Sequence, residues 1–396
     1  MLHLVMGRKR SSPALPKERL TRRKTTTGDN RTRRVRAGAS PLARTGRTEV
    51  EVLEPAEQFE LMPSRHQTRF DEPFRDFEYV GGIHLTNSIL WCDSDRRRDL
   101  SFVSHAHTHF VGKNRRILAT DKTVKILTRK SGKLDALTSP YKRSFTLGPL
   151  RLELHPAGHV LGSSQLVIDR DDRRLVFASD ICPRRSATVE RARPIACDSL
   201  VISPSYGHPM YRFPERDEVF ANLCKFIDDS LNDSATPVLF ANTIGTSQEL
   251  MRRLGDAGYK LRVHASIYDV AKVYRSLGVS MHGSRRFSGK PGKEDVVLFP
   301  PILKKHVAIR KLKKSRTAII SGRAIEPGYA LQQRVSEAFP YSDAADYFEL
   351  MDFIKDTGAQ EIYLYGDRFV EDFGAGLRKQ GRKVIPLVQP KQLSLL

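Results

Sequence analysis

The stretch Ser104-His105-Ala106-His107-Thr108-His109-Phe110 places three imidazole rings within five residues. It directly follows the apolar run Leu100-Ser101-Phe102-Val103, which predicts a short strand, so the histidines come at the end of that strand. Imidazoles at positions i and i+2 of a tight turn can converge on one zinc ion at about 2.0–2.1 Å. A His-x-His pair also occurs in turns that bind nothing, so this interpretation depends on the sequence that follows.

Two later strand ends supply further residues of the kind that bind metals. One is Pro156-Ala157-Gly158-His159-Val160-Leu161-Gly162-Ser163, where the glycines beside His159 allow a close approach of the backbone. The other is Val176-Phe177-Ala178-Ser179-Asp180, which ends in a carboxylate. We predict a zinc site formed by His105, His107, His159 and Asp180, with His109 as an additional candidate ligand. A water in such a site can be ionised near neutral pH, and we expect His159 and Asp180 to be its catalytic members, with Asp180 orienting the water.

The composition favours a globular protein of a reducing, cytoplasmic compartment. The length of 396 residues predicts about two domains. Hydrophobic residues make up 39% of the chain, and no apolar run approaches the roughly 18 residues of a membrane span. Its four cysteines form no Cys-x-x-Cys pair, so neither a disulfide framework nor a thiolate zinc site is indicated.

The first 55 residues form a basic segment that we expect to be a disordered arm. Residues 1–50 contain fourteen Lys or Arg and three acidic residues, which is +11 of the total charge of +22. Such a segment has too little apolar surface to fold alone. One interpretation is a nucleic-acid tether that neutralises phosphates through Arg22, Arg23, Lys24, Arg33 and Arg34. A peptide that targets an organelle and an upstream start codon explain the composition equally well.

The remaining chain predicts an α/β protein. Short apolar runs typical of strands occupy residues 83–91, 100–103, 150–154, 165–168 and 174–178. Amphipathic helices are predicted at 217–231, 246–254, 266–277 and 344–357, the second with a capping box at Thr246 and a terminating Gly255. Apolar runs between these helices, at 238–241, 296–299, 317–320 and 361–365, are typical of buried parallel strands.

Taken together, these motifs resemble those of the metallo-β-lactamase fold in its β-CASP nuclease branch. The matching stretches are Ser-His-Ala-His at 104–107, Pro-Ala-Gly-His-Val-Leu-Gly-Ser at 156–163 and the strand-end Asp180. Residues 205–214, 240–248 and 339–347 are similar to the bacterial ligase-associated DNA exonucleases and to messenger-RNA 3′-end-processing relatives. The resemblance extends from about Phe77 to the C-terminus.

The resemblance implies a four-layer αβ/βα sandwich with an inserted β-CASP cap. The implied segments are a first metallo-β-lactamase part at 56–204, the cap at 205–314 and a completing part at 315–396. It also implies DNA or RNA as a partner, and a DNA ligase, a helicase or an active paralogue as associated proteins. Positive charge outside the arm, including Lys313 and Lys314, is consistent with nucleic-acid binding, although a solvated loop explains that run as well.

Several family positions are altered in this sequence. The family's first motif is His-x-His-x-Asp-His, and its Asp is missing here whether His109 or Phe110 is aligned with the final His. Ser203 stands where the family has an acidic residue. Ala344 stands at the His of the family's Ser-Asp-His-Ala-Asp motif, and Tyr365 stands at a later His. The residues that match the ligands of the family's first metal are present. The site of the family's second metal lacks its first-motif Asp and its C-terminal His.

We therefore expect one bound ion, zinc or alternatively manganese, and weak or lost catalysis. A phenol with a pKa of about 10 is a poor replacement for a histidine ligand, and the loss of an acid or base typically costs about 10²–10⁴ in rate. Three hypotheses follow: a non-catalytic nucleic-acid-binding descendant, which we favour, a mononuclear metal-dependent exonuclease, and a structural scaffold subunit whose histidines satisfy one another or a structural metal.

Overall fold

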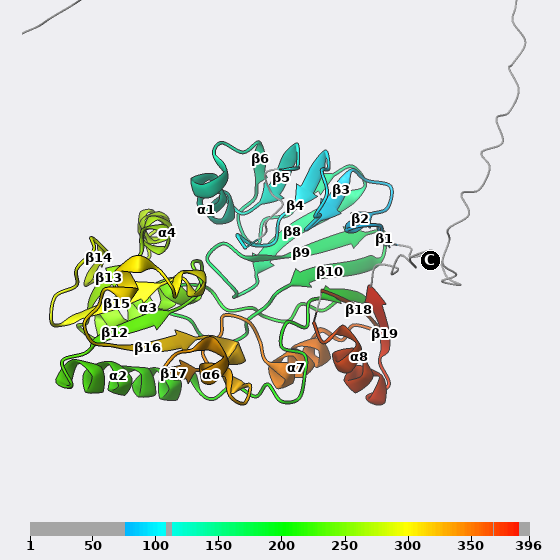
Figure 1. Cartoon of the computed structure of the whole chain (residues 1–396). Coiled ribbons are helices and arrows are strands. Elements are labelled where there is room, and N and C mark those ends of the chain that lie inside the picture. The colour runs from blue at the N-terminus through cyan, green and yellow to red at the C-terminus, as the bar shows by residue number, and fades with distance from the viewer. Residues whose placement is uncertain (1–75, 108–112, 367, 388–396) are drawn as a thin grey trace, which may run out of the picture. The chain divides into compact units, whose positions relative to one another are not determined.

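Three β-sheets organise the chain in the computed structural model, which describes residues 76–107, 113–366 and 368–387. All of these residues belong to one compact unit, Phe70–Leu396. The predicted arm, with Arg22, Arg23, Lys24, Arg33 and Arg34, lies outside the described residues, as do His109 and Phe110. Helices and parallel strands alternate through the second half, so the predicted α/β class is confirmed (Figure 1).

The first sheet has six strands in sequence order, with antiparallel pairing from β1 to β3 and parallel pairing from β3 to β6. Its strands are β1 (Phe77–Tyr79), β2 (Ile83–Leu85), β3 (Leu90–Cys92), β4 (Leu100–Phe102), β5 (Arg116–Ala119) and β6 (Ala136–Thr138). The single strand predicted over 83–91 is therefore two strands. Asn87, at φ 55°, lies in the left-handed region between them, a conformation that Asn adopts more readily than most residues.

The second sheet has the order β19-β18-β11-β10-β9-β8-β7. Its strands are β7 (Phe145–Leu147), β8 (Leu150–Pro156), β9 (Ser164–Arg170), β10 (Arg173–Ser179), β11 (Ser199–Ile202), β18 (Glu361–Tyr365) and β19 (Lys383–Leu387). Along β8, Leu150, Leu152 and Leu154 are buried at a spacing of two residues, as expected when one face of a strand meets a core.

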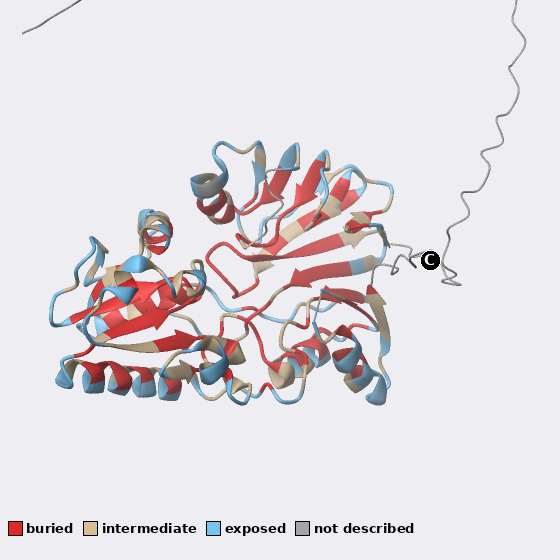
Figure 2. Ribbon diagram, viewed as in Figure 1, coloured by how far each residue is buried: buried red, intermediate tan, exposed pale blue. Residues whose placement is uncertain are grey.

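The first two sheets pack face to face. Their shared core contains Phe102 and Leu118 of the first sheet and Leu152 and Phe177 of the second, and the rings of Phe102 and Phe177 meet edge to face at 5.9 Å. On the first sheet, α1 (Asp121–Ser131) buries residues beside β5. The opposite face of the second sheet is covered by α7 (Tyr347–Thr357) and α8 (Val370–Lys379), where buried residues line the contact (Figure 2).

The third sheet is entirely parallel, with the order β14-β13-β15-β12-β16-β17. Its strands are β12 (Thr236–Phe240), β13 (Lys260–Val263), β14 (Ser284–Arg286), β15 (Asp295–Phe299), β16 (Ser315–Ile320) and β17 (Glu337–Phe339). β15 is buried at every position, as is typical of a central parallel strand. Because β16 and β17 pair within this sheet, the predicted boundary between residues 314 and 315 falls inside it.

The helices of this region are α2 (Arg216–Asn232), α3 (Thr246–Asp256), α4 (Ala265–Ser276), α5 (Val307–Arg310) and α6 (Tyr329–Gln333). The start of α3 differs from the prediction. Its N-cap is Gly245, whose N–H donates to the Gln248 side chain at 2.8 Å, so Thr246 does not form the expected capping box. Gly255 lies inside the helix, where a Cβ would overlap the carbonyl oxygen of His282, so close packing rather than termination requires glycine there.

Candidate metal centre

Three histidines come together where strands of the first two sheets end. His105 and His107 follow β4, and His159 lies in the loop between β8 and β9. One ring nitrogen from each lies within 4.8 Å of the others, and His105 and His159 are each only 7% exposed. The Nδ1 of His107 and the Nε2 of His159 are 2.9 Å apart.

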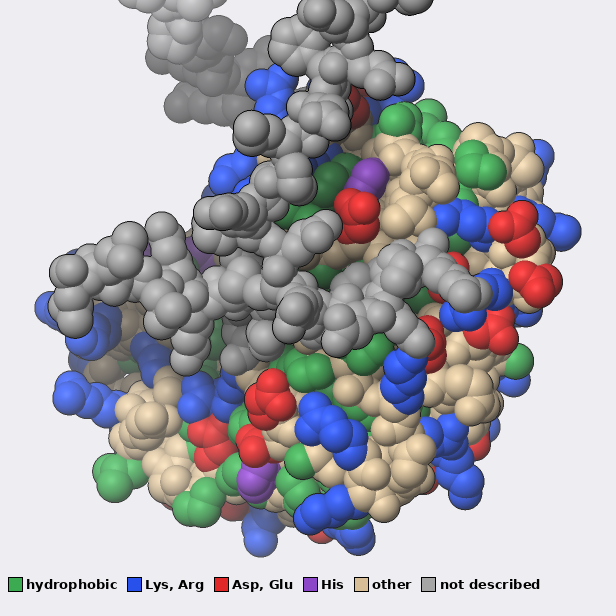
Figure 3. All heavy atoms as spheres, turned by 90° about the vertical axis from the view of Figure 1, so that its right-hand side faces the viewer, with side chains coloured by type: hydrophobic (Ala, Val, Ile, Leu, Met, Phe, Trp, Pro, Cys, Tyr) green, Lys and Arg blue, Asp and Glu red, His purple; other side chains and the backbone are tan. Residues whose placement is uncertain are grey.

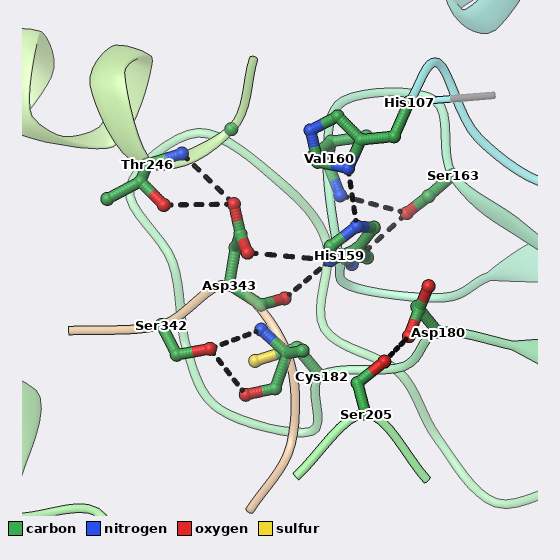
Figure 4. A network of polar contacts seen from close by, with 12 residues as sticks. His107, His159, Val160, Ser163, Asp180, Cys182, Ser205, Thr246, Ser342 and Asp343 are labelled. Carbon is green, nitrogen blue, oxygen red and sulfur yellow. Dashed lines mark hydrogen bonds and ion pairs between the residues drawn. The ribbon is translucent and has the colours of Figure 1, made fainter. Parts of the chain in front are cut away.

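The outer nitrogen of each ring has a hydrogen-bond partner that fixes which nitrogen faces inward. Figure 4 shows this for His159, which lies between Asp343 and His107. The Nδ1 of His159 lies 2.9 Å from the carbonyl oxygen of Asp343, and the Nε2 of His107 lies 3.1 Å from that of Ile244. A carbonyl only accepts, so both outer nitrogens carry the proton. For His105, Nδ1 is 2.8 Å from the hydroxyl of Ser104, which leaves Nε2 facing inward.

The surroundings of His105 and His107 favour the neutral form of both rings. Burial lowers the pKa of His105 well below its usual value, and the neighbouring His159 and His107 lower it further. Burial also lowers the pKa of His107, again with help from His159. With the protons on the outer nitrogens, the inner nitrogens of His107 and His159 can present lone pairs to each other. The donor set therefore fits a cation, because metal ligation requires neutral imidazole with its second nitrogen hydrogen-bonded.

The loop that carries His159 is held at several points. Gly158 has φ 75°, and a Cβ there would overlap the carbonyl oxygen of Cys182, so only glycine fits this close approach. The backbone N–H groups of His159 and Val160 both donate to the Ser163 hydroxyl, at 3.1 and 3.2 Å. The predicted need for glycine beside His159 is thus explained by packing between two loops.

Asp180 lies at the edge of the histidine group. Its Oδ2 is 4.0 Å from the Nε2 of His105, and its Oδ1 accepts a hydrogen bond from Ser205. Ser179, at φ 54°, adopts the left-handed conformation directly before it. The carboxylate is thus in reach of the ring nitrogens, although the closest group consists of the three histidines.

A cavity of about 430 Å³ opens over these residues. Its walls combine the predicted ligands with residues from the third sheet and from the loop after β18. The lining residues are His105, His107, His159, Asp180, Ser203, Ser205, Tyr206, Asn242, Asp343, Ala344, Gly366 and Arg368.

Comparison with known proteins finds relatives of this chain. No protein-family profile matches it. The chain is 28% identical over 324 residues to a probable DNA ligase of Opitutus terrae, a match that covers 81% of this chain and 32% of that protein. It is 24% identical over 183 residues to an RNase J-like protein of Methanocaldococcus jannaschii, covering 40% of this chain and 43% of the relative.

Transcription termination factor FttA of a Lokiarchaeum is 27% identical over 106 residues, which cover 26% of this chain and 17% of that protein. These matches agree with the family resemblance seen in the sequence. The chain is a relative of the β-CASP metallo-β-lactamase proteins. It spans less than half the length of each of these relatives.

A solved structure supports the fold alone. A protein of unknown function from Enterococcus faecalis superimposes with a TM-score of 0.52 at 12% identity, covering 74% of this chain and 79% of the other. Within the described residues, no helix is long and apolar enough to cross a membrane.

Two of the positions where the sequence was expected to depart from the β-CASP motifs lie in the cavity beside the histidines. Ala344 and Ser203 line the cavity, and the Ser203 hydroxyl is 3.3 Å from that of Ser205. Tyr365 does not line it: its hydroxyl donates to Ser179 at 2.6 Å, and its ring stacks on Phe177 at 5.5 Å. Burial raises the pKa of Tyr365 well above its usual value, so the phenol stays neutral.

Asp93, which the sequence interpretation missed, organises the hydroxyl groups next to this tyrosine. Its carboxylate accepts from the backbone N–H and hydroxyl of Ser104, at 2.9 and 2.5 Å, and from the Ser179 hydroxyl at 3.1 Å. Burial raises its pKa to about 6. Asp93 directly follows β3, so the strand-end reasoning that selected Asp180 would also have found it.

The remaining predicted nucleic-acid contacts lie away from the cavity. Lys313 and Lys314 precede β16, and Lys314 Nζ donates to the carbonyl of Asp233 at 2.6 Å. The cavity meets this parallel sheet at the opposite end, since Asn242 follows the carboxyl end of β12. On the face carrying β18, β19 and α8, Lys and Arg are interspersed with Asp and Glu (Figure 3), so that face has mixed charge.

Proposed function

We propose that this chain binds nucleic acid at the histidine-lined cavity, holds one divalent metal ion there, and has weak or no hydrolytic activity of the exonuclease type. The observation that carries the proposal is the convergence of the inner nitrogens of His105, His107 and His159. These three residues would hold the ion, with Asp180 beside them. Zinc suits such a nitrogen-rich set, and manganese is the second candidate.

The charge of the cavity supports a role for the ion in binding an anion. Asp180 and Asp343 contribute two negative charges and Arg368 contributes one positive charge, so the lining sums to −1. A divalent ion would bring this sum to +1 and would supply a Lewis acid beside a bound phosphodiester. We therefore expect nucleic-acid binding in the cavity to depend on the metal.

The proposed weakness of catalysis rests on what the altered positions offer. Ala344 has no side chain that can transfer a proton, and Ser203 replaces a carboxylate with a hydroxyl. The Tyr365 hydroxyl is already bound to Ser179. Asp180 would still orient a water molecule, and its position near His105 favours the alternative of a mononuclear exonuclease. A scaffold subunit is the third candidate.

The packing supports a finer description of the fold. We propose that α1, the first sheet, the second sheet and the α7–α8 layer form the four-layer metallo-β-lactamase sandwich. The third sheet would be the β-CASP cap. Because β17 ends at Phe339, the chain would return to the sandwich after that residue rather than at 315. Association with a ligase, a helicase or an active paralogue remains a prediction.

Metal analysis combined with a nuclease assay tests the proposal. Purified protein should contain about one zinc or manganese ion per chain, and His159→Ala should remove it. His282→Ala, at an exposed histidine near α3, is the matched control and should retain the ion. Labelled single-stranded DNA and RNA should bind but show little nucleotide release. Two ions per chain would contradict the one-metal site, and turnover lost in His107→Ala would establish the mononuclear nuclease instead.

A further inference from the structure

Arg368 occupies a distinctive place in the cavity. Among the described residues that line it, Arg368 is the only Lys or Arg. It lies in the loop between β18 and α8, and its side chain is 45% exposed. A permanent positive charge that solvent can reach therefore stands beside the three histidines.

Contacts with two other segments of the chain orient this guanidinium. Its Nη2 donates to the Tyr211 hydroxyl at 3.3 Å and lies 3.5 Å from the Oε1 of Glu326. Glu326 follows β16 and is itself fixed by Arg323, which donates to both carboxylate oxygens at 2.7 Å. The hydrogen bond from Arg323 lowers the pKa of Glu326 to about 2, so this carboxylate is ionised at neutral pH.

The rest of the guanidinium is available for a ligand. Within the part of the chain that the structure describes, Nε and Nη1 of Arg368 have no hydrogen-bond acceptor. The group lies over the Phe369 ring at 4.7 Å, which supports one of its faces. A guanidinium that keeps free N–H donors beside its permanent charge is suited to donate to a phosphate oxygen.

Two other arginines near the cavity are arranged differently. Arg184 donates to the carbonyl of Ala344 at 2.6 Å and pairs with Glu349 at 3.1 Å. Arg216 donates to the carbonyl of Ser342 at 2.6 Å. Both hold the backbone of the loop that carries Asp343, and neither lines the cavity. These two arginines hold the loop from outside the cavity, whereas Arg368 lines the space where a ligand would lie.

We infer that Arg368 binds a phosphodiester group of nucleic acid at the histidine cavity, and that Glu326 positions it for this contact. The inference rests on the proposed function and adds a residue to it. Glu326 lies in the segment after β16 of the third sheet and Arg368 in the loop after β18 of the second, so the ion pair joins segments that follow two different sheets. Glu326 is a positioning residue because it reaches the ligand only through Arg368.

Fluorescence anisotropy with a 5′-labelled single-stranded 20-mer, as DNA and as RNA, tests the inference. Metal-loaded protein is titrated at several salt concentrations. Arg368→Ala should weaken binding about tenfold or more, because hydrogen bonds between charged groups are stronger than those between neutral groups. The slope of log affinity against log salt should become shallower by about 0.7. Arg368→Lys should keep the slope and lose only part of the affinity, since it retains the charge but not the planar set of donors.

The matched control is Arg378→Ala. Arg378 is 43% exposed and lies on α8, where it pairs with Glu371 at 3.8 Å. This variant should bind like the unaltered protein. Glu326→Gln should weaken binding by itself but have no further effect when Arg368 is already alanine, which separates positioning from general destabilisation. Thermal unfolding of each variant is measured alongside. If Arg368→Ala is unfolded, the Arg368→Lys titration decides whether Arg368 contacts the phosphodiester.

The outcomes separate this inference from the proposed function. If the unaltered, metal-loaded chain binds neither oligonucleotide, the proposed function is wrong. If it binds both, but Arg368→Ala binds with unchanged affinity and salt slope, the phosphodiester contact is wrong while the proposed function stands. An additive loss in the Glu326→Gln and Arg368→Ala double variant would overturn the positioning role alone.

Discussion

The two sides of the metal centre are built in contrasting ways. On one side, His105, His107 and His159 direct inner nitrogens toward one point and occupy their outer nitrogens with oxygen acceptors. On the other side, the hydroxyls of Tyr365, Ser179 and Ser104 donate to one another or to Asp93. The first arrangement leaves lone pairs for a ligand, and the second satisfies its polar groups internally. The histidine side is therefore the side that could hold a metal ion.

The largest expected effect comes from removing a converging ligand. His159→Ala should lower zinc affinity by more than about a hundredfold, which exceeds the usual cost of losing an outer hydrogen bond. Competition with a chromogenic chelator measures it. Retention of zinc at unaltered affinity would show that the ion lies elsewhere and would remove the contrast.

Asp93 tests whether the hydroxyl side is structural. Its pKa of about 6 lies above the ordinary value of 3.8, so the folded state binds a proton more tightly than the unfolded state. In the metal-free protein, this residue should make the free energy of unfolding fall as pH rises from about 4 to 6, by about 2–3 kcal/mol. The stability difference between the unaltered protein and Asp93→Asn, from denaturant titrations at each pH, should follow that trend. A difference independent of pH would contradict it.

Thr246 tests how much the contacts around His159 contribute to zinc binding on the histidine side. Its N–H and hydroxyl both donate to the Oδ2 of Asp343, at 3.1 and 3.0 Å, and the Oδ1 of Asp343 lies 3.7 Å from the Nδ1 of His159. Thr246→Val removes one of these donors while keeping the shape. Zinc affinity should fall about tenfold, as for other outer contacts. An unchanged affinity in the chelator competition would mean that the backbone carbonyl alone orients the ring.

Tyr365→Phe should have the smallest effect. It removes one buried hydrogen bond, to Ser179, and keeps the ring stacked on Phe177. The expected loss of stability is about 1 kcal/mol, with no change in zinc affinity. A marked fall in affinity would show that the hydroxyl side takes part in holding the ion, and the two sides would then form one functional unit.

The sequence predicts the strand ends that carry the site, because ligand-type residues follow short apolar runs. His105, His107, His159 and Asp180 are all recognisable in this way, and Asp93 satisfies the same criterion. The acceptors that orient the rings are not recognisable, since they are backbone carbonyls of Ile244 and Asp343 from distant segments. Their contribution depends on tertiary position and not on side-chain type.

Arg368 illustrates a second limit of sequence reasoning. Charge counting directs attention to basic runs such as Lys313-Lys314, which lie at the far end of the third sheet from the cavity. A single arginine in a loop gives no comparable signal, and its partner Glu326 is remote in the chain. Likewise, Thr246 has the pattern of a helix cap, but its side chain binds Asp343 because Gly245 and Gln248 already form the start of α3.

Gly158 links the two halves of the site mechanically. Because its backbone lies directly against the carbonyl of Cys182, the loop bearing His159 and the loop following Asp180 touch without any side chain between them. A displacement of one loop should therefore move the other, because no flexible side chain lies between them. The spacing between imidazole and carboxylate is set by main-chain thickness, and a single added methyl group would disturb both at once.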